Sequence, residues 1–292
     1  MLSGVITKGI GGFYYVETED GLYECRARGV FRIKGITPLP GDYVSISVID
    51  TKARTGFIEE TKERKNFLVR PAVANIDQII IVIAIRSPQP DFELVDRLLV
   101  TSEMKNMESV VCVNKMDLGN AEDLNAITDI YKKAGYKVFA TSCVDNTGID
   151  KLYDVIKGKI TVLAGQSGVG KSTLLNRIIE DNIMDTGTIS EKIERGRHTT
   201  RHAQLVPLKT GGYIVDTPGF SAYNLEDIKA NELQRYFPEF REFTYSCRFK
   251  GCNHIKEPDC GVKKAIEANL ISPGRYERYC KFFEELKKQV EY

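Results

Sequence analysis

The sequence has no long hydrophobic run. Its longest purely apolar segment is IIIVIAI, from Ile79 to Ile85, whereas a membrane-spanning helix needs about 20 apolar residues. The first residues, MLSGVITKGIGG, do not combine a charged segment, an apolar core and a small-residue cleavage site, so we expect no signal peptide. We therefore expect a cytoplasmic protein with no membrane partner.

The sequence also has no excess of charge of either sign. Its 41 Lys and Arg residues nearly balance its 40 Asp and Glu residues, so charge alone does not indicate a nucleic-acid partner. One stretch, RARGVFRIK, carries basic residues and no acid, at Arg26, Arg28, Arg32 and Lys34. It favours a polyanion such as RNA only weakly, because a charged run is more often a solvated face.

The length of 292 residues predicts two or three domains. Residues 1–64 contain short strand-like segments separated by Gly and Pro turns: FYYVET, LYECRARG, YVSISVI and TGFIEETK. Five strands in about 60 residues fit an OB-type barrel, a fold that often holds oligonucleotides. A packing module without a ligand is the alternative, because fold does not fix function.

Residues 65–222 alternate between apolar strands and helical segments. We expect strands at 79–85, 110–115, 137–142, 159–165 and 212–219, with helices near 92–104, 121–134 and 171–180. This alternation predicts a mostly parallel sheet with helices on both faces, whose functional loops gather at the carboxyl ends of the strands.

The segment GQSGVGKS follows the strand-like ITVLA and precedes the helical TLLNRII. In this context the glycines let backbone N–H groups surround phosphates, while Lys171 reaches the β- and γ-phosphates and Ser172 binds Mg²⁺. A chance match in a tight turn is the alternative, which the strand–turn–helix context disfavours. The residues expected to bind nucleotide here are Gly165, Gln166, Ser167, Gly168, Val169, Gly170, Lys171 and Ser172.

A second motif, NKMD, predicts which base is bound. Its residues are Asn114, Lys115, Met116 and Asp117. The Asp117 carboxylate can accept from guanine N1–H and N2–H₂, which adenine cannot satisfy, so an ATP-using kinase is disfavoured. NKMD alone would be weak evidence, but beside a phosphate-binding loop it is strong. The tripeptide TSC, with Ser142 and Cys143, fits a loop whose backbone contacts guanine O6.

A third motif, DTPG, follows the strand GYIV. Asp216 fits the carboxylate of the Mg²⁺ shell, and the Gly219 N–H can meet the γ-phosphate. Thr199 or Thr200 would complete the Mg²⁺ shell, and the sequence does not choose between them. A plain polar loop is the alternative for that stretch.

The residue after DTPG is Phe220, where Ras-type enzymes place a water-orienting glutamine. A phenyl ring cannot orient water, so His198 is the nearest catalytic candidate. The alternative is that His198 is only a solvated loop residue.

The C-terminal segment, residues 223–292, contains Cys247, Cys252, His254 and Cys260. Three thiolates and one imidazole form a closed tetrahedral set, which is typical of structural Zn²⁺; free cysteines beside an unrelated histidine are the alternative. Further on, an apolar stripe at helical spacing predicts a packed C-terminal helix. The stripe consists of Tyr276, Tyr279, Cys280, Phe283, Leu286 and Val290.

The motifs occur in a permuted order: NKMD, TSC, GQSGVGKS, HTT and DTPG. A Ras-like domain has the phosphate-binding loop first, so the chain has been cut and rejoined, which a domain with neighbouring termini tolerates. We thus expect three domains: an OB barrel at 1–64, a circularly permuted GTPase domain at 65–222 and a zinc-binding domain at 223–292.

This combination of motifs resembles the small-ribosomal-subunit-dependent GTPase A family over essentially the whole chain. The resemblance implies a GTPase that acts late in maturation of the small (30S) subunit and is stimulated by it, and it points to the same His198. From the motifs we expect Mg²⁺ and one structural Zn²⁺ as cofactors. Taking motifs and resemblance together, we expect rRNA as the ligand of barrel and zinc module. We expect a monomer. A GTP-dependent binding switch whose turnover is incidental is the alternative.

Overall fold

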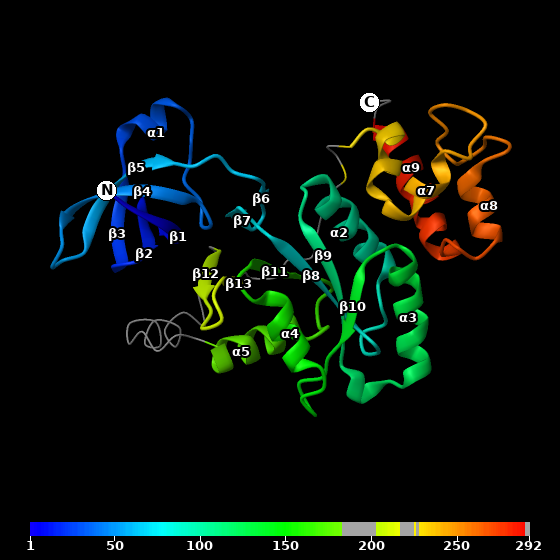
Figure 1. Ribbon diagram of the computed structural model, residues 1–292, viewed down its shortest axis with the longest axis horizontal. Helices are drawn as coiled ribbons and strands as arrows, with labels where there is room; N and C mark the ends of the chain where they lie inside the picture. Colours follow the sequence, from blue (N-terminus) through cyan, green and yellow to red (C-terminus); the bar gives the residue numbers. More distant parts are fainter. Residues whose placement is uncertain (183–202, 217–224, 226–227, 290–292) are drawn as a thin grey trace. The chain divides into compact units, whose positions relative to one another are not determined.

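The computed structural model describes residues 1–182, 203–216, 225 and 228–289. The chain divides into two compact units, each built from three separate stretches (Figure 1). The first unit comprises Met1–Gln78, Leu152–Leu163 and Ser172–Phe220, and the second comprises Ile79–Lys151, Ala164–Lys171 and Ser221–Tyr292. Among the described helices, none has the length and apolar character that crossing a membrane requires.

The N-terminal part of the first unit is a closed five-stranded barrel, which confirms the predicted fold of this region. Strand β1 pairs antiparallel with both β2 and β4, and β5 joins β3 to β4. Ile6, Val16, Val44, Ile46 and Ile58 are fully buried inside it. The elements are β1 (Leu2–Ile10), β2 (Phe13–Thr18), β3 (Gly21–Ala27), α1 (Gly29–Ile33), β4 (Tyr43–Asp50) and β5 (Thr55–Thr61).

The barrel is joined to a hairpin in the same unit. Strand β12 pairs antiparallel with β13 on one side and with β1 on the other, where Gln204 lies opposite Lys8. Glu17 of the barrel accepts a hydrogen bond from the Tyr213 hydroxyl. The remaining elements here are β6 (Phe67–Val69), β7 (Ala72–Ala74), β11 (Ile160–Ala164), α5 (Lys171–Asn182), β12 (Gln204–Pro207) and β13 (Tyr213–Asp216).

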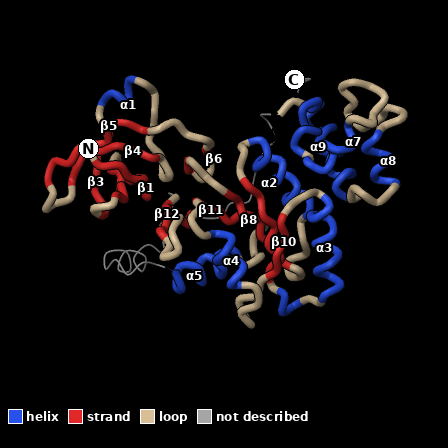
Figure 2. The backbone as a smooth tube through the Cα atoms, viewed as in Figure 1, coloured by secondary structure: helices blue, strands red, loops and turns tan. Residues whose placement is uncertain are grey.

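The second unit contains the predicted strands at 79–85, 110–115 and 137–142 and the predicted helices near 92–104 and 121–134 (Figure 2). Every residue of β8 is buried, as the apolar run that starts at Ile79 predicts for a central strand of a parallel sheet. Strands β9 and β10 run parallel. The elements are β8 (Gln78–Ala84), α2 (Phe92–Met104), β9 (Glu108–Asn114), η1 (Met116–Leu118), α3 (Ala121–Lys133), β10 (Lys137–Ala140) and α4 (Ile149–Ile156), which continues into the first unit.

The C-terminal module, residues 228–289, is helical and belongs to the second unit. Of the predicted stripe on the last helix, Tyr279 and Leu286 are buried, and Tyr276, Cys280 and Phe283 pack against the same core. Val290 lies outside the described residues. The elements are η2 (Ala230–Tyr236), η3 (Pro238–Phe240), α7 (Arg241–Thr244), α8 (Gly261–Glu267) and α9 (Pro273–Gln289).

A buried charge cluster fixes α9 to the rest of the second unit. Arg275, whose side chain is 1% exposed, donates to Asp96 of α2 and to Glu239 of η3, each at 2.5 Å. Arg278 contacts the other oxygen of Asp96, also at 2.5 Å. The aromatic ring of Phe237 lies 5.1 Å from the Arg275 guanidinium carbon. The charges therefore stay paired where water is excluded, as buried ions must.

Candidate functional site

The segment GQSGVGKS forms a tight turn between β11 and α5, as its spacing predicts. Gly165 has φ +136° and Gly170 has φ +98°, values that side-chain-bearing residues rarely adopt. A Cβ at position 165 would collide with the Val82 carbonyl oxygen, and one at position 170 with the Asn114 side chain. Both glycines are therefore required by space as well as by backbone conformation.

Lys171 folds back over this turn. Its Nζ donates to the carbonyl oxygens of Gly165 and Gln166, each at 2.7 Å. Burial lowers the pKa of Lys171, so a nearby anion would stabilise its charged form. Ser172, the second residue of α5, is exposed, as are Ser167 and Gly168, and Val169 is buried.

The NKMD motif is hydrogen-bonded to the phosphate-binding loop, although the two lie about 50 residues apart in the sequence. The Asn114 Nδ2 donates to the Val169 carbonyl at 2.9 Å. Its Oδ1 accepts from the Thr141 hydroxyl at 3.0 Å. Asn114 is 3% exposed, so both ends of a buried amide are paired. The sequence predicts only a nucleotide-binding role for Asn114, because no local pattern indicates its hydrogen bond to Val169.

The predicted base-binding residues lie together at the ends of β9 and β10. The Ser142 hydroxyl donates to Asp117 Oδ1 at 2.8 Å, and the Met116 N–H donates to the Thr141 carbonyl at 3.2 Å. Asp117 is exposed and Cys143 half-buried. Lys115 has φ +62° and donates to the Ser87 carbonyl at 2.6 Å. This arrangement holds a carboxylate at the surface, oriented by a buried hydroxyl, where it can accept from two neighbouring N–H groups.

Asp216 is the last residue of β13, in the first compact unit. It is half-buried, and burial raises the pKa of its carboxyl group. A divalent cation would offset the cost of ionising it there, so the donor chemistry of Asp216 and the Ser172 hydroxyl fits Mg²⁺. The other residues predicted for this chemistry lie outside the described residues: His198, Thr199, Thr200 and Gly219.

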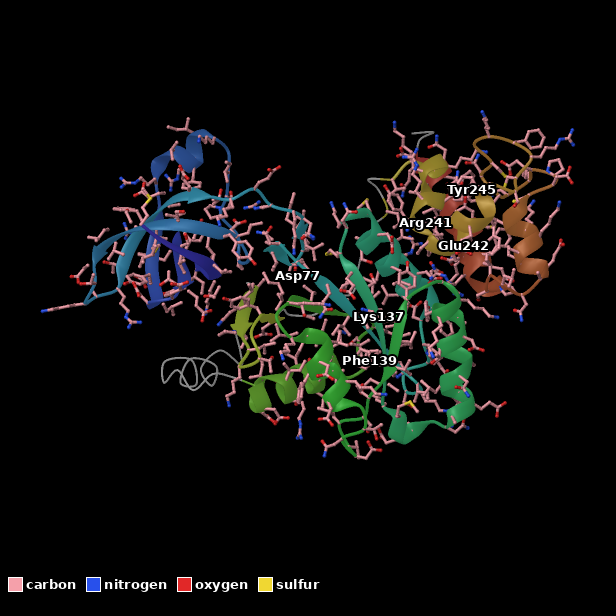
Figure 3. The ribbon with its side chains drawn as sticks, in the orientation of Figure 1. Asp77, Lys137, Phe139, Arg241, Glu242 and Tyr245 are labelled. Carbon is pink, nitrogen blue, oxygen red and sulfur yellow. The ribbon has the colours of Figure 1, made fainter. Side chains whose placement is uncertain are left out.

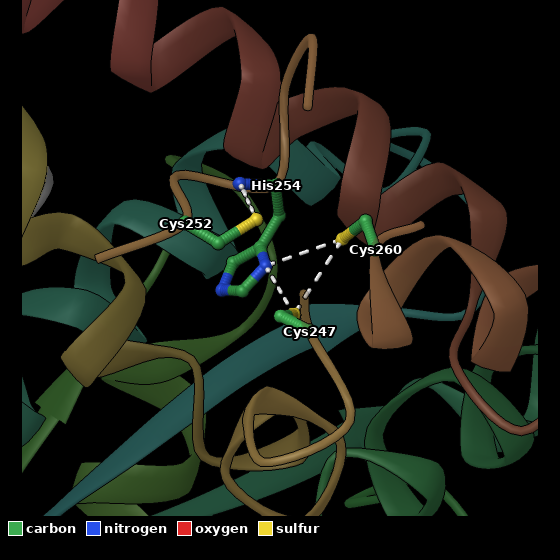
Figure 4. A group of neighbouring side chains, drawn as sticks. All are labelled: Cys247, Cys252, His254 and Cys260. Carbon is green, nitrogen blue, oxygen red and sulfur yellow. Dashed lines mark hydrogen bonds between the residues drawn. The ribbon is translucent and has the colours of Figure 1, made fainter. Parts of the chain in front are cut away.

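Cys247, Cys252, His254 and Cys260 converge in the C-terminal module (Figure 4). Their ligand atoms all lie within 4.8 Å of one another. Sγ of Cys247 and Sγ of Cys260 are 3.9 Å apart, and His254 Nδ1 lies 3.6 and 3.3 Å from them. Zn–S bonds of about 2.3 Å in a tetrahedron place sulfur atoms about 3.8 Å apart. The spacing therefore fits a four-coordinate zinc ion, with no open position for catalysis.

The surroundings of these ligands favour a cation. Burial raises the pKa of the Cys252 thiol to about 12 and also raises that of Cys260. Thiolates at this site would thus need a metal ion to stabilise them. Backbone N–H groups already point at the sulfur atoms: His254 N lies 3.4 Å from Cys252 Sγ, and Gly261 N lies 3.3 Å from Cys247 Sγ.

Glu257 organises the loop that carries the ligands, which the sequence did not indicate. Its carboxylate accepts from three backbone N–H groups, those of Asn253, Ile255 and Lys256, at 2.9–3.0 Å. Burial alone would raise the pKa of Glu257, but these bonds lower it below its usual value. The loop is therefore shaped by a charge-assisted hydrogen-bond network.

Comparison with known proteins gives consistent similarities. A family model named RsgA GTPase matches residues 61–226, and a model named RsgA N-terminal domain matches residues 3–58. A relative from Ruminiclostridium cellulolyticum, named small ribosomal subunit biogenesis GTPase RsgA, is 50% identical over 100% of this chain and 96% of its own. One of the same name from Alkaliphilus metalliredigens is 47% identical over 100% of both chains.

Two solved structures are similar to this chain in both sequence and fold. The crystal structure of YloQ, described as a circularly permuted GTPase, is 38% identical with a TM-score of 0.83, over 99% of this chain and 96% of that one. YjeQ from Thermotoga maritima is also 38% identical with a TM-score of 0.83, over 98% of each chain. The fold is therefore that of a circularly permuted GTPase, as the order of the motifs predicts.

Proposed function

The chain belongs to the RsgA family of GTPases and is a GTP hydrolase, and from that premise we propose that it acts in maturation of the small ribosomal subunit. Two relatives, matched over 96% and 100% of their length, carry that role in their names. Within the chain, the Asn114–Val169 hydrogen bond carries most weight, because it joins the NKMD motif to the phosphate-binding loop. The same names do not favour a binding switch with incidental turnover.

We propose that guanine is held by NKMD and TSC and the phosphates by GQSGVGKS. The support is the exposed Asp117 carboxylate oriented by Ser142, and the Lys171 ammonium folded over the loop. Ser172 and Asp216 would contribute to the Mg²⁺ shell together with Thr199 or Thr200, and Gly219 would meet the γ-phosphate. The bound Mg²⁺ supplies charge neutralisation at the phosphates. His198 stays our candidate for orienting the attacking water.

We propose that Cys247, Cys252, His254 and Cys260 hold one structural Zn²⁺. The support is the near-tetrahedral spacing of their ligand atoms and the closed Cys₃His donor set. Such a site would stabilise the C-terminal module rather than perform chemistry.

We also propose a domain division at residues 64 and 222, a monomer, and rRNA as the ligand of barrel and zinc module. On the barrel, the Arg26 guanidinium lies 4.5 Å from the Phe13 ring centre, which forms a basic aromatic surface. On the C-terminal module, Tyr245 is 93% exposed and Arg241 is also exposed (Figure 3). Aromatic and basic side chains of this kind suit stacking on bases and pairing with phosphates. The expected location is the cytoplasm, where the proposed substrate would be found.

The test is GTP hydrolysis under multiple turnover with small ribosomal subunits, with large subunits, and with neither. A large stimulation by small subunits alone is expected, because the residue after DTPG cannot position water and a partner would complete the site. Lys171→Ala serves as the inactive control. Equal, slow rates in all three conditions would contradict the ribosomal role and leave the GTPase assignment intact.

A further inference from the structure

The two ring nitrogens of His254 face different partners. Nδ1 points at the thiols, 3.3 Å from Cys260 Sγ. Nε2 points the other way and lies 2.8 Å from the side-chain oxygen of Gln234. His254 is 1% exposed, so water does not replace this contact.

We propose that Gln234 is a positioning residue for the metal centre, an inference that rests on the proposed zinc site. A neutral imidazole carries one N–H, and an amide oxygen can only accept. The contact with Gln234 therefore places the proton on Nε2 and leaves the Nδ1 lone pair directed at the metal. Metal-binding histidines are commonly oriented in this way by a second hydrogen bond.

The orientation of the Gln234 amide has support of its own. Its nitrogen, Nε2, donates to the Asn231 carbonyl at 3.4 Å, which directs the amide oxygen towards the histidine. Leu233 of η2 and Phe237, the residue that follows η2, are fully buried in the module core and hold this helix in place. The Gln234 oxygen is thus held in place by backbone and packing, independently of the metal.

The histidine is also confined from other directions. The Phe240 ring lies edge-on at 5.7 Å from the imidazole, and the Tyr276 hydroxyl donates to the His254 carbonyl at 2.7 Å. These contacts fix the backbone and one edge of the imidazole, and they leave Nε2 facing the Gln234 oxygen. Gln234 lies on η2, the first helix that the structure describes after Asp216. Through this bond, metal affinity depends on the placement of η2, which packs against both α2 and α9.

The experiment compares Zn²⁺ affinity in the full-length protein by competition with a chromophoric chelator. Gln234→Leu removes the acceptor at similar size and should weaken binding about 10- to 100-fold. Gln234→Glu keeps an acceptor and should bind at least as tightly as the unmodified protein. Arg235→Ala is the matched control, because its exposed side chain on the same helix pairs only with Glu232 among the contacts described. The absorption spectrum of the Co²⁺-substituted protein should change in Gln234→Leu and stay unchanged in Arg235→Ala.

The outcomes separate the two proposals. An unmodified protein that takes up no Zn²⁺ would refute the metal site itself. Normal uptake with equal affinities for Gln234→Leu and Arg235→Ala would refute the positioning role alone. If Gln234→Leu does not fold, Gln234→Asn replaces it, since its amide is one methylene too short to reach Nε2. Weak Zn²⁺ binding by Gln234→Asn together with tight Zn²⁺ binding by Gln234→Glu would support the proposal. Equal Zn²⁺ affinities of these two variants would overturn it.

Discussion

The glycines of the phosphate-binding loop differ in what surrounds them, and this difference gives a prediction at the scale of single residues. Gly168 and Gly170 both have positive φ, but a Cβ at position 168 would meet only Pro88 Cδ at 3.7 Å, whereas one at position 170 would collide with Asn114. Backbone strain of about 1–3 kcal/mol applies to both substitutions. Gly170→Ala should also disrupt the Asn114–Val169 bond, with a further loss of about 1–2 kcal/mol.

Urea unfolding of the nucleotide-free protein checks this, with Gly168→Ala as the matched control. Equal losses of unfolding free energy in the two variants would show that the contact with Asn114 has no energetic importance.

Ser142 should matter for base affinity through Asp117. Ser142→Ala removes the 2.8 Å bond that orients the carboxylate, and a hydrogen bond to a charged group contributes about 1.5–3 kcal/mol. GTP affinity should therefore fall by at least about tenfold, as measured with a fluorescent guanine nucleotide. The affinity for ITP should fall less in Ser142→Ala than the affinity for GTP, because hypoxanthine offers N1–H but no amino group to Asp117. A loss of the same size for both nucleotides would argue against an oriented Asp117.

Asp216 gives a pH-dependent prediction. Burial raises its pKa above the ordinary value of 3.8, so the folded protein binds this proton more tightly than the unfolded chain. The contribution of Asp216 to stability therefore falls as pH rises from the unfolded pKa through the folded pKa. Asp216→Asn should remove that fall and raise the melting temperature at pH 7 without Mg²⁺, while weakening Mg²⁺-dependent GTP binding. Melting curves from pH 4 to 7 in Mg²⁺-free buffer check the sign; a melting temperature of Asp216→Asn at pH 7 below that of the unmodified protein would contradict it.

At the scale of elements, the attachment of α9 to α2 depends on Arg275. Arg275→Met keeps much of the volume but leaves Glu239 without its buried partner and Asp96 with Arg278 alone. Breaking a buried ion pair from one side costs about 3–5 kcal/mol, which urea unfolding would measure. Lys281→Met is the control on the same helix: its exposed pair with Glu93 should contribute about 0–1 kcal/mol. Similar losses from both variants would mean that Arg275 is not the anchor.

Helix α9 shows that periodicity predicts buried apolar residues but not a buried charged residue. Helical spacing identified Tyr279 and Leu286, which are buried, because apolar side chains on one face need no knowledge of their partners. It did not identify Arg275, because a buried arginine depends on Asp96, 179 positions away in the sequence. The bounds of strand β1 are likewise not predictable from alternation, because its glycines weaken the alternating pattern.

For the candidate sites, short motifs predicted the residues with local spacing, and the structure brings NKMD, TSC and the phosphate-binding loop together. The partners that orient them were not predictable. Ser142 reaches Asp117 across 25 positions, and Gln234 reaches His254 across 20. Such contacts depend on how distant elements pack, and Ser and Gln are common enough that neither residue stands out in a sequence.

At the scale of the whole molecule, the described apolar clusters of barrel and C-terminal module are separate and share no residue. Cys252 and Cys260 belong to the C-terminal cluster, together with Phe240 and Tyr279. Removing the proposed zinc ion should therefore loosen that cluster, since buried thiols and a buried imidazole would lose the ion proposed to hold them together. Residues of the barrel core, such as Ile6 and Ile46, should be unaffected.

Hydrogen exchange with and without a strong chelator measures how far metal removal loosens the C-terminal cluster. Exchange should accelerate at η2, α8 and α9, and strands β1–β5 should keep their protection, because their ladder and core contain no metal ligand. Cys280→Ala, which alters a thiol outside the ligand set, should respond to the chelator as the unmodified protein does, whereas Cys252→Ala should exchange rapidly even without it. Uniform acceleration of barrel and C-terminal module would mean that the two unfold as a single cooperative unit despite their separate cores.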